Sequence, residues 1–399
     1  MKLYTAKVDT TVARRVVADD MMLTKGLPTA AGSRMLDGYQ SLFEAEVLTR
    51  LSAKGYTLGG KADVGEFAID LVGETSYNGA CVADGTLKNA AAEIVKNGEA
   101  MAAVCLDVNG SVRRAAAQSG LVSVKPTYGT VSRFGTVPVA CSGETVSVMA
   151  KTADECQDVL DAMVGHDDKD GTSLSDELCA KVKKADAPAA RRVAVLTSMK
   201  EGIDSTVAAK LEAAVNVLKE NGVEVVDVES SVIAASRVAW NILMSAELCN
   251  NVSRYDGVKY GYRSETFTNI EELYTNSRTE AFGELLKTAI LFGSETLSTD
   301  NYMKVYDKAL RTRRVIVEAF GKLFEEYDAV LMPACSTMAY TEEQIKANKY
   351  MAFEENAYTA PASVTGLPAA IAGGVQFVGK AFSENTLFGL VRMLEKEGK

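Results

Sequence analysis

Ser111 is the residue whose type and position best suit nucleophilic chemistry. It follows an apolar run at residues 101–106 and the turn formed by Asn109 and Gly110, and it precedes a helix predicted at residues 113–118. A serine between a buried strand and a helix is either the N-cap of that helix or an exposed nucleophile. The function of the chain depends on which of the two Ser111 is.

The chain has a single histidine, which limits the catalytic mechanisms that Ser111 can use. His166 is the only histidine, and it lies in the polar segment GHDDKDGTS, far along the chain from the serine turn. A Ser-His-Asp arrangement needs a histidine beside the serine. We interpret His166 as a loop residue, so a nucleophile at Ser111 needs a different base.

Composition excludes several classes of function. The chain has 399 residues, 47% of them hydrophobic, and a formal net charge of -10. Such a charge argues against a nucleic-acid groove, because phosphates are neutralised by clustered Lys and Arg. The seven cysteines are scattered without CxxC spacing, so we expect reduced thiols, no metal and no cofactor. Without an apolar leader or a membrane-length run, the sequence predicts a cytoplasmic protein that does not enter membranes.

The elements around the turn predict an α/β protein. Hydrophobic spacing indicates an amphipathic helix at 43–54, and a strand, helix and strand at 192–196, 205–221 and 223–228 form the clearest parallel βαβ unit. We expect 130–150 to be rich in strands, and residues 359–382 (TAPASVTGLPAAIAGGVQFVGKAF) to give a turn and a strand before a closing helix at 383–397. Together these elements predict one domain over residues 1–399, in which a mixed central β-sheet has helices on both faces.

Several blocks resemble the amidase signature family, and within it the A subunits of glutamyl-tRNA(Gln)/aspartyl-tRNA(Asn) amidotransferases. They include KGLPTAAGSRML, DVNGSVRRAAAQSGLVSVKPTYG, YDAVLMPA and TAPASVTGLPAA, and they occur in the family's order from about Val16 onward. The resemblance implies the amidase-signature fold, with the family's N-terminal helical region largely missing. It also implies C–N amide hydrolysis as the ancestral chemistry.

The resemblance implies a triad of which this chain keeps one member. The family uses a serine nucleophile, a second serine that relays the proton, and a lysine kept neutral in a buried pocket. Ser111 matches the nucleophile, but the lysine position falls on Asp19 and the relay serine falls on Gly85. With an ordinary pKa near 3.9, a carboxylate at position 19 is expected to be a poor base for an alcohol.

The substrate-binding positions implied by the resemblance are also altered. Asn109 replaces a glycine beside Gly110, in the turn that supplies backbone donors to an oxyanion. A family carboxylate falls on Asn356 and a family arginine falls near Thr288 or Ala289, whereas Tyr260 matches a retained tyrosine. We expect substrate contacts, where any survive, at Tyr260, Asn356, Asn109 and Gly110.

A relocated triad is an alternative. Thr86 lies next to the lost relay position and Lys88 two residues on, so they would have to supply the hydroxyl and the amine. The simpler interpretation is that Thr86 caps the following helix and Lys88 is solvated. Asp19 could instead hold an amine, but Asp19 and Asp20 are neighbours on a strand and point to opposite faces, which argues against a shared chelate.

These residues lead to two hypotheses about function. The first is a catalytically impaired homologue with a binding role, whose partners would be B- or C-type amidotransferase subunits, an active paralogue, or a small amide or amino-acid ligand. The second is an active amidase or glutamine amidotransferase-type hydrolase that uses Ser111 by a rearranged mechanism.

Overall fold

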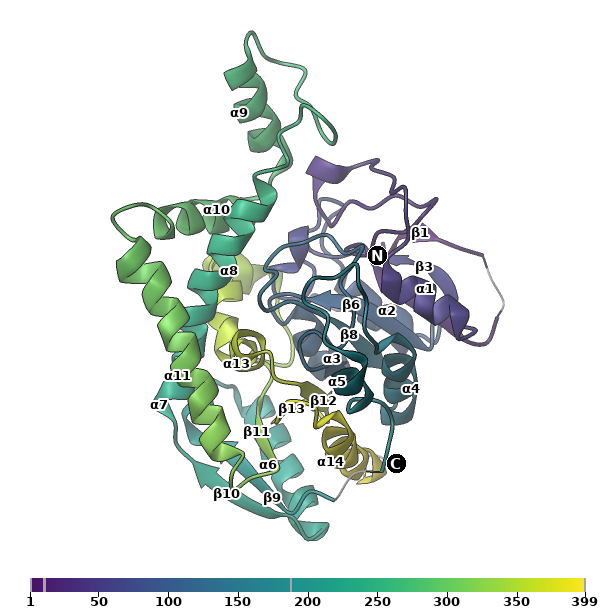
Figure 1. Ribbon diagram of the computed structural model, residues 1–399, viewed down its shortest axis with the longest axis vertical. Coiled ribbons are helices and arrows are strands. Elements are labelled where there is room, and N and C mark those ends of the chain that lie inside the picture. Colours follow the sequence, from purple (N-terminus) through teal and green to yellow (C-terminus); the bar gives the residue numbers. More distant parts are fainter. Residues whose placement is uncertain (1, 10–11, 187–188, 398–399) are drawn as a thin grey trace.

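A mixed β-sheet forms the centre of the molecule (Figure 1). The computed structural model describes residues 2–9, 12–186 and 189–397. Within these residues, eleven strands are hydrogen-bonded in the order β1-β3-β2-β6-β8-β7-β12-β13-β11-β9-β10, and β4 and β5 form a separate hairpin. The strands are β1 (Tyr4–Lys7), β2 (Arg15–Asp19), β3 (Thr57–Ala62), β4 (Val82–Ala83), β5 (Thr86–Leu87), β6 (Ala102–Asp107), β7 (Val122–Lys125), β8 (Thr145–Ala150), β9 (Arg192–Leu196), β10 (Glu224–Val228), β11 (Ala329–Pro333), β12 (Ala369–Ala372) and β13 (Val375–Gly379).

The sheet contains two groups of parallel strands. β3, β2 and β6 are parallel to one another, and so are β11, β9 and β10. Antiparallel pairing through β8, β7, β12 and β13 joins the groups. The predicted βαβ unit is confirmed as β9, α6 (Ser205–Glu220) and the parallel β10. The predicted fold class, a mixed α/β sheet with flanking helices, is also confirmed.

Helices cover the sheet. Those that position the serine turn are α3 (Ser111–Ser119), α8 (Ser236–Val252) and α13 (Met351–Thr365). Helix α9 (Ile270–Ala281) projects from the rest of the molecule in Figure 1. The others are α1 (Glu46–Ala53), α2 (Ala90–Lys96), α4 (Ala153–Met163), α5 (Asp176–Ala180), α7 (Ser231–Ala234), α10 (Glu284–Thr296), α11 (Asp307–Leu323), α12 (Glu342–Ala347) and α14 (Glu384–Glu397).

One described helical stretch, Ser231–Val252, has the length and apolar composition of a membrane span. Half of its most apolar window is buried inside the fold. It packs against α10, α13 and α11, and Trp240 and Leu243 within it are each 1% exposed. These features are typical of a core helix.

Two expectations about local structure held only in part. Residues 359–382 contain the expected turn and strand, as β12, a turn and β13, but the first seven of them, TAPASVT, are the last part of α13, which contains Pro361 and is capped by Gly366 with φ of 71°. Burial of this segment outweighs the hydrogen bond that a proline inside a helix removes. Of residues 130–150 only β8 is a strand, because side chains satisfy the backbone elsewhere: Glu144 Oε2 accepts from the N–H groups of Val139 and Ala140.

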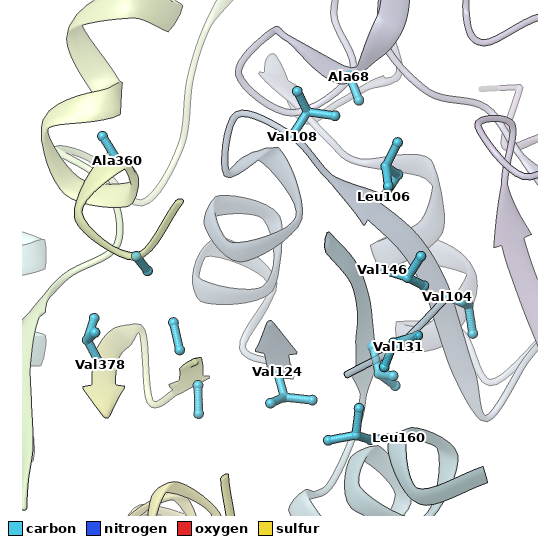
Figure 2. Close-up of a cluster of buried hydrophobic side chains, with 14 of the residues drawn as sticks. Ala68, Val104, Leu106, Val108, Val124, Val131, Val146, Leu160, Ala360 and Val378 are labelled. Carbon is cyan, nitrogen blue, oxygen red and sulfur yellow. The ribbon is translucent and has the colours of Figure 1, made fainter. Parts of the chain in front are cut away.

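The core fixes the end of β6, after which the serine turn begins. Figure 2 shows Val104 and Leu106 of β6 in a buried cluster with Val146 of β8 and Val124 of β7. All six residues of β6 are buried. Val108, just beyond the strand, belongs to the same cluster and is fully buried. The turn that carries Ser111 therefore follows directly after a strand whose position is fixed by the core.

Candidate functional site

Ser111 is the first residue of α3 and is almost completely buried. The N-cap is Gly110, and no side chain caps the helix, so the interpretation of Ser111 as an N-cap was wrong. Ser111 is not an exposed nucleophile either, because only 4% of it is accessible. Its hydroxyl makes no hydrogen bond to any residue that the structure describes. A serine without an acceptor for its proton is a weak nucleophile.

Gly110 gives the turn its shape. Its φ is 84°, and a Cβ at this position would lie 2.3 Å from Thr359 Cβ of α13. The Gly110 N–H donates to Asp107 Oδ1 over 3.1 Å, so this donor is already used. Asp107 is in turn paired with Arg113 Nε at 2.8 Å. Although burial favours the protonated carboxyl, the Arg113 guanidinium holds the pKa of Asp107 below its ordinary value.

Asn109 fills the space beside the serine turn. Its Nδ2 donates to the Ile69 carbonyl oxygen at 2.8 Å, and its Oδ1 accepts from Trp240 Nε1 at 3.0 Å. Its main-chain oxygen accepts from Thr359 Oγ1 at 3.2 Å. Both Asn109 and Trp240 are 1% exposed. The Asn109 amide, at the position where the resemblance places a glycine, is therefore held on several sides by α8, α13 and the loop after β3.

Asn356 on α13 lies in the same group of side chains. One end of its amide is 2.6 Å from Asn241 Oδ1, and the other end is 3.0 Å from Asn109 Oδ1. Asn356 is fully buried. The position where the resemblance places a substrate-binding carboxylate therefore holds a neutral amide that binds other protein amides.

Tyr260 and Thr288 lie apart from this group. Tyr260 is 40% exposed, and its ring lies 6.3 Å from that of Tyr39 and 6.1 Å from that of Tyr255. Thr288 Oγ1 donates to the Glu284 carbonyl oxygen within α10. Of the four residues expected to contact a substrate, Asn109, Gly110 and Asn356 lie together. No described contact joins Tyr260 to them.

Asp19, at the lysine position, ties two parallel strands together. Its Oδ2 accepts from Leu106 N on β6 at 2.8 Å, and its Oδ1 accepts from Met21 N at 3.1 Å. Burial raises the pKa of Asp19 to about 7, against the effect of these two N–H donors. The expectation of an ordinary, low pKa was therefore wrong, because it ignored the loss of solvation. No hydrogen bond joins Asp19 to Ser111 among the described residues.

A buried lysine that sequence reasoning missed lies close to Asp19. Lys61 on β3 is fully buried, and its Nζ contacts Asp20 at 2.8 Å, Thr29 Oγ1 at 2.5 Å and the Pro28 carbonyl oxygen at 2.9 Å. Burial lowers the pKa of Lys61, and Asp20 opposes this effect. Three acceptors use the three donors of an ammonium group. Lys61 is therefore a structural cation, and its only sequence signal is a lysine that follows Gly59 and Gly60 in a strand.

The position where the resemblance places the relay serine lies in an exposed hairpin. Gly85, with φ of 71°, lies at the turn between β4 and β5, and a Cβ there would have no atom within 4 Å. Thr86 Oγ1 donates to the Ala83 carbonyl oxygen at 3.0 Å. The helix cap expected at Thr86 is instead Asn89, whose side chain accepts from Ala92 N.

Neither member of the relocated triad contacts the nucleophile. No described contact joins Thr86 or the Lys88 side chain to Ser111. Cavities of 670, 520 and 480 Å³ lie on the molecule, and Ser111 lines none of these three. The structure therefore brings Ser111, Asn109, Gly110 and Asn356 together and leaves Gly85, Thr86 and Tyr260 outside.

This fold and the position of its serine define a class of protein. A strand of a mixed sheet ends in a glycine turn, and a serine opens the next helix, as the resemblance to the amidase signature family implied. The Amidase family model matches residues 18–388, so the chain belongs to the amidase family.

Within that family the chain is similar to the A subunits of glutamyl-tRNA(Gln) amidotransferases. It is 34% identical to the A subunit from Latilactobacillus sakei subsp. sakei over 388 residues, covering 92% of this chain and 79% of the relative. For the Acinetobacter baumannii protein, identity is 33% over 399 residues, covering 94% and 81%. The predicted resemblance is thus confirmed.

Solved structures agree. The crystal structure of the glutamyl-tRNA(Gln) amidotransferase A subunit from Thermotoga maritima has a TM-score of 0.80 and 26% identity, covering 99% of this chain and 87% of that one. A 6-aminohexanoate cyclic dimer hydrolase shares the fold with a TM-score of 0.81 at 18% identity, covering 98% and 86%.

Proposed function

We propose that this protein is an amidase-family member that has lost serine-based hydrolysis and acts by binding a partner. One observation carries the proposal: the Ser111 hydroxyl has no hydrogen-bond partner among the described residues, while both oxygens of Asp19 accept backbone N–H groups. An alcohol attacks a carbonyl efficiently only when a nearby group takes its proton. Loss of such a device removes several orders of magnitude in rate.

The packing around the turn supports the same proposal. Asn109, Trp240 and Asn356 are buried against each other where the family-type reaction would need space for an amide. Moving these three side chains apart to make room for a substrate would break a buried hydrogen-bond network, which costs free energy. Ser111 itself is only 4% exposed, so a ligand could reach its hydroxyl only if neighbouring side chains moved.

The binding role is inferred from the names of the relatives. They are called A subunits of amidotransferases, which implies other subunits, and this chain covers about four fifths of their length. We therefore propose a B- or C-type subunit or an active paralogue as partner, in the cytoplasm. Affinity capture of the tagged full chain from its native lysate tests this. Recovery of an amidotransferase subunit or an amidase paralogue supports it, and recovery of neither contradicts it.

A second candidate function, an active amidase that uses Ser111, is favoured by one observation. Burial raises the pKa of Asp19 to about 7, which is suitable for a general base at neutral pH. Ammonia release from glutamine, asparagine and simple amides should be compared between the wild-type protein and Ser111→Ala. Release that disappears in Ser111→Ala establishes this second function, and equal background in both proteins supports the first.

A further inference from the structure

A cavity of about 670 Å³ lies outside the carboxyl ends of two parallel strands. Ser198 follows β9 and Ser336 follows β11, and both residues line it together with α13. In open α/β sheets, ligands bind in crevices outside the carboxyl ends of the strands. The volume is within the range of small-molecule sites.

This cavity is separate from the serine turn. Met351, Glu355 and Tyr358, spaced three and four residues apart along α13, line the cavity. Asn356 and Thr359 lie on a different face of α13 and contact Asn109. Residues with these spacings share one face of a helix. The helix thus separates two different sites.

Glu355 places at this cavity a buried carboxylate, one oxygen of which can still accept a hydrogen bond. The residue is 4% exposed, and its Oε2 accepts from Tyr340 Oη at 2.6 Å and from Ser336 N at 3.0 Å. Its Oε1 has no hydrogen-bond partner among the described residues, and it is not one of their fully buried atoms. Buried charge is costly unless it is paired. A cationic group of a ligand could pair with the Glu355 carboxylate through this free oxygen.

Arg237 places an unpaired cation on the wall of the same cavity. Arg237 is exposed, and its side chain makes neither a hydrogen bond nor an ion pair with the described residues. Burial and the charge of Glu355 raise the pKa of Tyr358 while Arg237 lowers it, so both charges lie near this phenol. A guanidinium fits a carboxylate in a bidentate manner. Glu201 and Glu354 also line the cavity, which makes its lining net negative.

We propose that this cavity binds a small basic α-amino acid, with the ligand carboxylate on Arg237 and one of its two cationic groups on Glu355. The second cationic group then lies near Glu201 and Glu354. A ligand with one negative and two positive groups complements a lining of three glutamates and one arginine. The inference does not rest on the proposed function, because Ser111 takes no part in it.

Isothermal titration of the full chain with L-lysine tests the proposal. Cadaverine lacks the carboxylate and L-glutamine lacks the second cation, so each should bind at least about tenfold more weakly, a difference of about 1.4 kcal/mol. Glu355→Gln keeps an oxygen that can accept from Tyr340 and removes the charge. This variant and Arg237→Met should each weaken L-lysine binding about tenfold or more.

The matched control is Arg314→Met, which removes an arginine that is 77% exposed on α11, outside the cavity. It should bind L-lysine as the wild-type protein does. The proposal is overturned if L-lysine shows no binding up to about 10 mM, a free energy weaker than about 3 kcal/mol. It is also overturned if L-glutamine binds as tightly as L-lysine, or if Arg314→Met weakens binding as much as Arg237→Met.

Discussion

Introducing at position 19 the lysine that the resemblance places there should destabilise the protein rather than restore hydrolysis. Asp19→Lys replaces a carboxylate that accepts from Leu106 N and Met21 N by an ammonium that can only donate. Hydrogen bonds to a charged group contribute about 1.5–3 kcal/mol each, and an uncompensated buried charge costs about 3–5 kcal/mol. Since Asp19 is 3% exposed, little solvent screens this loss. We expect unfolding free energy to fall by about 3–5 kcal/mol.

Urea unfolding at pH 8, where Asp19 is mostly ionised, measures this change. Trp240 is the only tryptophan and contacts Asn109, so its fluorescence reports on the serine turn itself. Asp300→Lys makes the same charge change at an exposed position and should alter stability by no more than about 0.5 kcal/mol. If Asp19→Lys is as stable as Asp300→Lys, or gains amide hydrolysis that needs Ser111, the reasoning about position 19 is refuted.

Three further predictions concern the same part of the fold. Trp240→Phe removes the donor to Asn109 Oδ1 and should lower stability by about 1–2 kcal/mol in urea unfolding followed by circular dichroism, whereas no loss would mean that this bond contributes nothing. Gly110→Ala should lower the free energy of unfolding by about 3 kcal/mol or more, and Gly85→Ala by only about 1 kcal/mol. Both glycines have positive φ, but only a Cβ at position 110 would collide with Thr359. Equal losses of stability in urea unfolding would contradict the close packing of Gly110 against Thr359. Burial raises the pKa values of Asp19 and Glu66 to about 7, so the folded state holds more protons than the unfolded chain from about pH 4 to 7, and unfolding free energy should fall as pH rises through this window. Asp19→Asn should make that slope shallower, and an unchanged slope would show that Asp19 does not titrate there.

Much of the fold could be predicted from local signals. The unit of β9, α6 and β10 follows from apolar periodicity, and α6 ends within one residue of the predicted end at 221. By contrast, the helical conformation of residues 359–365, which include Pro361, was not predicted, because it depends on tertiary burial of α13. Strand character in 130–150 was overestimated, because apolar residues there are buried by loops that Glu144 and Arg133 hold in place.

The site could be predicted only in part. The resemblance to the family pointed to Ser111, Asp19 and Asn109, but contacts of Asp19 and Asn109 come from elements far away in the chain. Trp240 bonds Asn109 across 131 residues, and no local pattern signals such a contact. The raised pKa of Asp19 follows from burial, which a residue type alone does not reveal.

Covalent labelling of Ser111 is the most direct test of the central claim that its hydroxyl is not activated. The full chain should be incubated with a fluorophosphonate, beside an active serine hydrolase as positive control, and its intact mass measured. We expect no adduct on the wild-type protein, as on Ser111→Ala, because no described group accepts the proton of this hydroxyl. An adduct that forms on the wild-type protein, maps to Ser111 and is lost in Ser111→Ala would contradict the claim.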